Sequence, residues 1–286
     1  MREGASMQLS FTKMHGCGND YIYINCFAQP VDDPAELAIR LSHRNFGIGG
    51  DGIILICPSE VADAKMRIFN IDGSEGRMCG NGIRCVAKYL YDHHLVDRTC
   101  ITIETLSGIK TLYLTVEQGL VTQVRVEMGK ASLKPADLPV LLEGDRIVGR
   151  TVEIAGGQHA ITCVSMGNPH CVLFCQQDID TLDLEKIGPK FEFDPLFPER
   201  VNTEFIQLLP DHTLKMRVWE RGSGETMACG TGACASVVAA VENGYFQKGE
   251  AVQVHLKGGD LTICYSDEQV LMQGPATEVF EGVIQL

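Results

Sequence analysis

The sequence predicts a mixed α+β fold assembled from two similar halves, and three observations support this prediction. A Cys-Gly-x-Gly segment occurs twice, at Cys79 and at Cys229, and the two cysteines are 150 residues apart. A glutamate precedes each cysteine by four residues (Glu75 and Glu225), and an apolar helix-like run follows each. Strand-like alternation of apolar and polar residues is more frequent than helical periodicity. An internal duplication, with one buried helix in each half, is the simplest explanation.

Each expected element has a recognisable pattern or boundary. Asp33 and Pro34 supply an N-cap and a favoured first residue, and Asn243-Gly244 is a typical helix stop. We expect helices at residues 34–44, 82–93, 182–187 and 232–243. Runs rich in β-branched residues predict strands at 53–57, 101–104, 111–116, 121–127 and 252–256, among others. The second and fourth helices are apolar enough to be the central helices of the two halves.

Length and composition place the chain among globular proteins. It has 286 residues, of which 45% are hydrophobic and 21% charged, and this excludes the disordered and fibrous classes. The formal net charge is −13, and no cluster of Lys or Arg interrupts the acidic balance. Nucleic acids and anionic membranes are therefore not expected as partners. No apolar run approaches the ~18 residues of a membrane span.

Cysteine usage and the beginning of the chain predict a cytoplasmic protein. Residues 1–10 contain no apolar segment of the kind found in signal peptides. The twelve cysteines form no C-x-x-C pair, so neither a zinc site nor a thioredoxin-type couple is expected, and a reducing compartment suits twelve free thiols. Residues 1–6 are interpreted as an extension, with Met7 as the first residue of the fold.

A glycine-rich segment matches a nucleotide-binding fingerprint in its letters but not in its context. Gly47-x-Gly49-x-x-Gly52 follows a helix-like stretch and precedes a strand. The dinucleotide fingerprint instead leaves a strand and enters a helix. We therefore interpret residues 47–52 as a tight loop.

Cys79 and Cys229 are the candidate catalytic residues, because each lies in a glycine-flanked turn where a helix begins. The free backbone N–H groups and the positive dipole end of a helix favour an anion there. We expect a lowered thiol pKa and a carboxylate-binding position on the amides of Gly80-Asn81 and Gly230-Thr231. The alternative is a buried structural cysteine, which is our interpretation of most of the other ten.

Two thiols on opposite faces of one carboxylate-bearing molecule are what a two-base racemase needs. The α C–H group of an amino acid is a very weak acid, so a thiolate removes its proton only where a preorganised site stabilises the carbanion. A thiol on the other face then returns a proton and inverts the configuration. The two cysteines would share one proton as a coupled pair.

Six segments, in order along most of the chain, resemble those of the diaminopimelate epimerase family. They are KMHGCGND at 13–20, FNIDGS at 69–74, CGNGIR at 79–84, MGNPH at 166–170, NTEF at 202–205, and WERG with ACGTGA at 219–233. The resemblance implies two pseudo-symmetric domains, each a β-sheet or barrel wrapped around a central helix, with the active site in the cleft between them. The implied halves are 7–130 with 275–286, carrying Cys79, and 131–274, carrying Cys229.

The resemblance also implies a role for each matching residue. Cys79 and Cys229 correspond to the acid/base pair, and His170 and Glu220 to residues that help set the thiol pKa values, Glu220 also being a substrate contact. Taken alone, either would be read as a structural polar residue. The implied substrate-binding residues are Asn19 at the reacting end, Gly80, Asn81, Gly230 and Thr231 at the α-carboxylate, and Asn70, Asn168, Asn202 and Arg221 at the distal amino-acid group.

As a family property, the resemblance implies epimerisation of L,L- and meso-diaminopimelate for lysine and peptidoglycan synthesis, without pyridoxal phosphate or a metal, by a homodimer. Two departures stand out. Gly52 occupies a position where some family members carry Gln, so a side-chain contact to substrate is absent. Phe280 stands where family members often carry Tyr at a dimer contact.

Other functions remain open at this point. Proline, hydroxyproline and other amino-acid racemases share the fold, but a small substrate would leave the distal polar set unpaired, at about 1–3 kcal/mol for each group. Side activity on another amino acid such as glutamate is compatible with the motifs. A thiol redox sensor or cysteine-bound metal protein, and a binding module for free amino acids, are alternatives of other classes.

Overall fold

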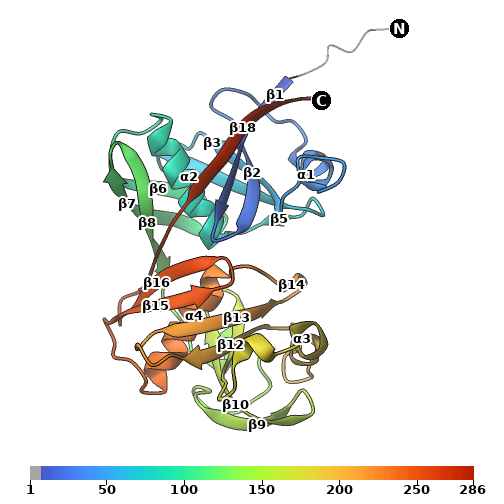
Figure 1. Cartoon of the computed structure of the whole chain (residues 1–286), viewed down its shortest axis with the longest axis vertical. Coiled ribbons are helices and arrows are strands. Elements are labelled where there is room, and N and C mark those ends of the chain that lie inside the picture. Colours follow the sequence, from blue (N-terminus) through green and yellow to red (C-terminus); the bar gives the residue numbers. More distant parts are fainter. Residues whose placement is uncertain (1–7) are drawn as a thin grey trace. The chain divides into compact units, whose positions relative to one another are not determined.

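The computed structural model describes residues 8–286, so the expectations for residues 1–7 lie outside the described part of the chain. Within that part there are eighteen strands and four α-helices, which confirms the predicted α+β class with more strand than helix. The chain divides into two compact units: one runs up to Val126 and includes Pro275–Leu286, and the other is Glu127–Gly274 (Figure 1). Among residues 8–286, no helix is long and apolar enough to cross a membrane.

Eight strands form the sheet of the first unit, in the order β18–β1–β2–β3–β4–β6–β7–β8. Successive neighbours are antiparallel, antiparallel, parallel, antiparallel, parallel, antiparallel and antiparallel. The strands are β1 (Gln8–Gly16), β2 (Asn19–Asn25), β3 (Gly52–Cys57), β4 (Ala64–Asn70), β6 (Cys100–Thr105), β7 (Gly108–Glu117), β8 (Leu120–Gly129) and β18 (Thr277–Gln285). A two-residue strand, β5 (Glu75–Gly76), pairs with the end of β4.

The second unit repeats this topology, with the order β9–β10–β11–β12–β13–β15–β16–β17 and the same succession of directions. Its strands are β9 (Arg150–Ile154), β10 (Gly157–Ser165), β11 (Pro169–Phe174), β12 (Asn202–Leu208), β13 (Leu214–Glu220), β15 (Ala251–Leu256), β16 (Gly259–Tyr265) and β17 (Val270–Gly274), with β14 (Gly224–Glu225) as the equivalent of β5. The internal duplication predicted from the repeated cysteine segments is thereby confirmed.

Each sheet wraps around one helix, as predicted. In the first unit, α2 (Gly80–Asp92) contacts β1 and β2 as well as β6 and β7. Strands near both ends of the strand order therefore contact this helix. In the second unit, α4 (Gly230–Glu242) contacts β10 to β13 and also β16 and β17. Both helices begin two residues earlier than the sequence predicted, directly after Cys79 and Cys229.

The early start of both helices depends on a glycine in the first turn. A Cβ atom on Gly82 would lie 2.5 Å from Ile54 Cδ1, and one on Gly232 would lie 2.7 Å from Glu204 Oε1. A side chain from a neighbouring strand therefore fills the space beside each helix mouth, and it would have to move to admit a residue larger than glycine. Because glycine is a poor helix former, sequence periodicity placed the helix start after the first turn.

The other two helices lie between equivalent strands, α1 (Pro34–Ser42) before β3 and α3 (Leu184–Glu192) before β12. The predicted N-cap is confirmed, since Asp33 accepts a hydrogen bond from Glu36 N. The predicted bounds of α3, 182–187, were wrong, because the helix begins at Leu184 and continues through Gly188 and Pro189 to Glu192. A Cβ on Gly188 would lie 2.2 Å from the Trp219 ring, so this glycine allows close packing of α3. Residues 47–51 form the predicted loop, and Gly52 begins β3.

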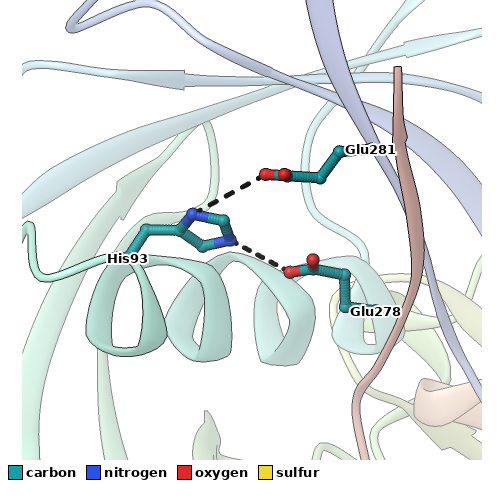
Figure 2. A group of neighbouring side chains, drawn as sticks. All are labelled: His93, Glu278 and Glu281. Carbon is teal, nitrogen blue, oxygen red and sulfur yellow. Dashed lines mark hydrogen bonds and ion pairs between the residues drawn. The ribbon is translucent and has the colours of Figure 1, made fainter.

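The C-terminal strand belongs to the first unit, where β18 pairs with β1. Figure 2 shows His93, the C-cap of α2, between Glu278 and Glu281 of β18. His93 Nε2 donates to Glu278 at 3.0 Å, whereas Nδ1 lies 3.9 Å from Glu281. The two carboxylates approach opposite nitrogens of the ring. We interpret this group as an anchor between β18 and α2.

Candidate active site

In the first unit, the Cys79 thiol lies at the mouth of α2 and contacts other predicted residues. Its Sγ accepts a hydrogen bond from Gly82 N and donates one to Asn19 Oδ1, both at 3.3 Å. Asn81, in the first turn of α2, donates to the same Asn19 oxygen at 3.4 Å. The structure therefore brings Cys79, Asn19 and Asn81 together, beside the first helical residue, Gly80. Amides in the first turn of a helix have no intrahelical acceptor and suit a carboxylate.

Two charged residues that the sequence reasoning missed hold this arrangement. Asp51 Oδ2 accepts from Asn19 Nδ2 at 2.7 Å, which directs the other end of the amide towards Cys79. Arg84 is fully buried and donates to Asn81 Oδ1 at 3.0 Å and to Gly80 O at 3.1 Å. Asp51 lies within the glycine-rich segment 47–52, and Arg84 is the last residue of the CGNGIR segment. Arg84 could have been noticed in the sequence as a charged residue within an apolar helix.

In the second unit, Cys229 occupies the same position at the mouth of α4. Its Sγ accepts from Gly232 N at 3.3 Å and lies 3.5 Å from Thr231 Oγ1. Asn168 Nδ2 donates to the same threonine oxygen at 3.3 Å. Gly230, the first helical residue, is buried beside them. Four predicted residues thus meet here, with Thr231 in the place that Asn81 has in the first unit.

His170 and a third missed residue, Glu204, form a buried pair behind this mouth. His170 Nδ1 donates to Glu204 Oε1 at 2.6 Å, and neither side chain is exposed. His170 Nε2 faces Asn168 Oδ1 at 3.1 Å. Glu204 belongs to the NTEF segment. It could have been noticed in the sequence as a carboxylate within an apolar strand-like run.

The electrostatics at Cys229 correct one expectation from the sequence. Burial raises the pKa of the Cys229 thiol well above its ordinary value, and the nearby Glu220 and Glu204 carboxylates raise this pKa further. Hydrogen bonds from Thr231 and Gly232 N act in the opposite direction but do not outweigh burial. The predicted lowering by the helix dipole is therefore wrong for Cys229, because partial charges at a helix end are weaker than desolvation and full negative charges.

Glu220, the last residue of β13, lies near Cys229, as predicted. Burial raises the pKa of its carboxyl group, while hydrogen bonds with Thr226 and the Cys229 thiol, and the proximity of His170, oppose this rise. A carboxyl group with a raised pKa that contacts a thiol can exchange a proton with it.

The residues predicted for the distal group lie at strand ends. Asn70 ends β4, and its amide donates to Ser74 Oγ at 3.0 Å within a turn. Asn202 begins β12; its Nδ2 donates to Pro169 O at 3.0 Å, and its Oδ1 accepts from Arg221 N at 2.9 Å. Arg221 is exposed. Asn202 therefore positions the backbone of Arg221, a role that the sequence did not indicate.

Gly52 is the counterpart of Asn202, since each begins the strand that follows a crossover helix. A Cβ on Gly52 would lie 2.1 Å from Phe69 O, so β4 leaves no room for a side chain here. Position 52 therefore lacks a side chain that could contact substrate, and β3 packs closely against β4 at this point.

Solved structures define the class of fold. A hydroxyproline epimerase from Agrobacterium vitis matches with a TM-score of 0.69 at 14% identity, covering 98% of this chain and 93% of that one. A protein of the PhzF family from Bacillus anthracis matches with a TM-score of 0.72 at 17% identity, covering 98% and 100%. The chain therefore has the duplicated α+β fold of these proteins.

Sequence comparison identifies the family within that class. The family model described as diaminopimelate epimerase matches residues 11–134 and 162–279. A diaminopimelate epimerase of Acetivibrio thermocellus is 54% identical over 97% of this chain and 99% of its own length. One of Methanococcus maripaludis is 51% identical over 97% and 100%. The chain belongs to the diaminopimelate epimerase family, whose members are isomerases.

Proposed function

We propose that this protein interconverts L,L- and meso-diaminopimelate, with Cys79 and Cys229 as the acid/base groups and without pyridoxal phosphate. Membership of the family, with 54% identity to a near full-length relative of that name, supports the reaction. One observation carries the assignment of residues: each unit places a cysteine at the N-cap of its central helix. On this proposal, each unit contributes one of the two groups.

The reaction requires one thiolate and one thiol at a time. The raised pKa of Cys229 favours its thiol form at neutral pH, so Cys229 is assigned as the acid in the resting enzyme and Cys79, once its own thiol proton has left, as the base. The thiolate removes the α proton, and the electron pair of the broken C–H bond is delocalised into the adjacent carboxylate. The other thiol then protonates the opposite face of the α carbon. Each turnover exchanges the protonation states of the two cysteines.

When Cys229 acts as the base, its proton must first leave. Glu220 is the proposed acceptor, because its carboxylate hydrogen-bonds to the Cys229 thiol and has a raised pKa. The α-carboxylate is assigned to the amides of Gly80-Asn81 and Gly230-Thr231. Those amides stabilise the charge that develops on the carboxylate as the carbanion forms.

The distal amino-acid group is assigned to Asn70, Asn168, Asn202 and Arg221. The exposed Arg221 guanidinium offers a planar pair of donors to a second carboxylate. A proline-sized substrate has no second carboxylate to pair with Arg221, which disfavours the proline racemase alternative.

The decisive experiment follows the reaction in D2O. Reduced protein is treated with chelator, incubated with L,L-diaminopimelate without added cofactor, and monitored for α-deuterium and for the ratio of isomers. Deuterium uptake with conversion towards the meso isomer is the expected result. Folded, freshly reduced protein that exchanges no α proton would reject the proposal.

A second experiment tests the requirement that both thiols reach one α carbon. Treatment with a peroxide should convert the two thiols into a Cys79–Cys229 disulfide, each thiol losing a proton and an electron while the peroxide is reduced to water. Activity should disappear and return with a thiol reductant. Peptide mapping of inactive oxidised protein that finds both thiols unlinked would contradict this geometry.

We further propose a cytoplasmic homodimer whose contact includes β18. Phe280, Val279 and Val283 are exposed on that strand, and an apolar group on an exposed strand is typical of an interaction surface. Sedimentation analysis of the Phe280→Asp variant tests this assignment: the wild type should sediment as a dimer and the variant as a monomer.

A further inference from the structure

A buried carboxylate next to Cys229 has no part in the mechanism described so far. Glu204 is on β12 with none of its side chain exposed, and its Oε1 accepts from His170 Nδ1. Within residues 8–286, the other oxygen, Oε2, is buried with no hydrogen-bond partner. A buried carboxylate oxygen without a partner opposes folding. Stability therefore does not explain why a glutamate occupies this position.

The first unit demonstrates that the fold accepts an apolar residue here. Ile54 of β3 lies against Gly82, and Glu204 of β12 lies against Gly232 in the same way. A Cβ atom added to Gly82 would lie 2.5 Å from the Ile54 side chain, and one added to Gly232 would lie 2.7 Å from the Glu204 side chain. The same scaffold thus carries isoleucine beside one cysteine and glutamate beside the other. The difference concerns the chemistry of the two helix mouths.

Glu204 begins a chain of polar contacts that ends at Cys229. It accepts from His170 Nδ1, and the other ring nitrogen faces Asn168 Oδ1 at 3.1 Å. Asn168 Nδ2 donates to Thr231 Oγ1 at 3.3 Å, and that oxygen lies 3.5 Å from Cys229 Sγ. Both nitrogens of His170 face acceptor oxygens, so the bond to Glu204 fixes the ring and keeps a proton on Nδ1.

We infer that Glu204 is a positioning residue for the epimerisation proposed above: it orients His170 and, through His170, holds Asn168 and Thr231 against the Cys229 thiol. It does not touch the substrate, so its loss should lower kcat more than it changes KM. The inference rests on the proposed function for its kinetic consequence only.

The same carboxylate also adds negative charge at Cys229. Three charged or titratable side chains face this thiol or its neighbours from three strands: His170 on β11, Glu204 on β12 and Glu220 on β13. Glu204 is one of the two carboxylates that raise the pKa of Cys229. Removing its charge should lower that pKa, so the Cys229 thiolate should appear at lower pH.

Two substitutions separate position from charge. Glu204→Asp keeps the charge but withdraws the carboxylate from His170, and should lower kcat by about a hundredfold, the size expected for a misplacement of about 1 Å. Glu204→Gln keeps an acceptor near Nδ1 but removes the charge. Its Cys229 should be alkylated by iodoacetamide about tenfold faster at a given pH below the titration midpoint, because a lower pKa increases the fraction of thiolate.

The matched control is Glu192→Gln, which removes another buried carboxylate of the second unit. Glu192 accepts from Trp219 Nε1 at 2.8 Å and from Gly222 N at 3.0 Å. Its loss should lower the melting temperature and leave the alkylation profile of Cys229 unchanged. Circular dichroism reports on the folding of each variant, and peptide mapping assigns the alkylated thiol.

Wild-type kcat in a folded Glu204→Asp variant, or a wild-type alkylation profile in Glu204→Gln, would overturn the inference. If one variant does not fold, the other still decides. The alkylation profile requires no turnover, so it tests Glu204 even if the D2O experiment rejects diaminopimelate as the substrate.

Discussion

The mouths of α2 and α4 have matching backbones but different side chains around their cysteines. Each cysteine accepts a hydrogen bond from the N–H of the third helical residue at 3.3 Å, and each has an asparagine nearby. Around Cys79 the equivalent strand positions carry Tyr21, Ile54 and Asn70, whereas around Cys229 they carry His170, Glu204 and Glu220. Duplication thus preserved the scaffold, and three substitutions concentrate charge at one mouth.

This difference suits a reaction whose chemistry is symmetric but whose two bases must differ in protonation. Equal thiols in equal surroundings would have no preferred resting state, because they share one proton as a coupled pair. Buried negative charge at one mouth favours the thiol there. On the proposed mechanism, the surroundings of Cys229 therefore make it the cysteine that starts as the acid.

The largest effect should come from removing either thiol. Cys79→Ser and Cys229→Ser should each lower epimerisation by about a thousandfold or more, because an alcohol is a far weaker acid than a thiol and is almost entirely un-ionised at neutral pH. Turnover is measured from the L,L to meso ratio, and circular dichroism checks that both variants fold. Near-wild-type turnover in either variant would end the two-base assignment.

These variants also sharpen the comparison between the two mouths. α-Deuterium exchange without net inversion should persist in the variant whose remaining cysteine removes the proton from the isomer supplied. Comparing L,L- and meso-diaminopimelate as starting isomers then assigns one direction to each cysteine. Identical exchange in both variants from both isomers would contradict distinct roles.

Sequence reasoning located what depends on local pattern. The repeated Cys-Gly-x-Gly segments placed both catalytic candidates, and β-branched runs placed the strands, because each depends on neighbours along the chain. The starts of α2 and α4 were predicted late because Gly82 and Gly232 are helix-poor residues retained for a tertiary contact. Tertiary packing, here the approach of a strand, overrode local propensity.

What the sequence could not provide depends on groups far apart in the chain. Glu204 is 34 residues from His170, and Asp51 is 32 residues from Asn19, so neither pairing follows from a motif. The direction of the Cys229 pKa was mispredicted for the same reason. Its main causes, burial and two carboxylates from other strands, arise only when the chain folds.

A smaller effect is expected from Asp51, the residue that orients Asn19 at the mouth of α2. Asp51→Ala should lower kcat by about tenfold, since Asn19 loses the acceptor at 2.7 Å that fixes its amide. The alkylation profile of Cys229 should stay unchanged, because Asp51 belongs to the other unit. Steady-state kinetics and thiol mapping measure the two quantities.

Asp63→Ala is the matched control for Asp51→Ala, because Asp63 is also an aspartate of the first unit and binds Thr102 N at 2.8 Å instead of Asn19. Its loss should affect stability and leave kcat within about twofold, as for most changes away from a site. Equal kinetic losses in both variants would refute a specific role for Asp51.

The smallest effect concerns an ion pair that the duplication copied but placed in different surroundings. Arg67–Glu75 and Arg217–Glu225 occupy equivalent positions, with Nε to Oε1 distances of 2.8 Å and 2.7 Å. The carboxylates are 28% and 13% exposed. Glu225→Gln should lower the free energy of unfolding by about 1–3 kcal/mol, and Glu75→Gln by less than about 1 kcal/mol.

The pH dependence of these two losses distinguishes an ion pair from simple packing. The arginine partners lower the pKa of both carboxyl groups in the folded protein. Their contribution is therefore present above the ordinary carboxyl pKa and is lost as the pH falls through the lowered folded-state pKa. Urea unfolding at neutral and acidic pH should show the gap between wild type and Glu225→Gln closing in acid. A difference in unfolding free energy that persists in acid would assign the effect to packing. Equal losses at neutral pH for Glu225→Gln and Glu75→Gln would show that burial does not make one ion pair stronger than the other.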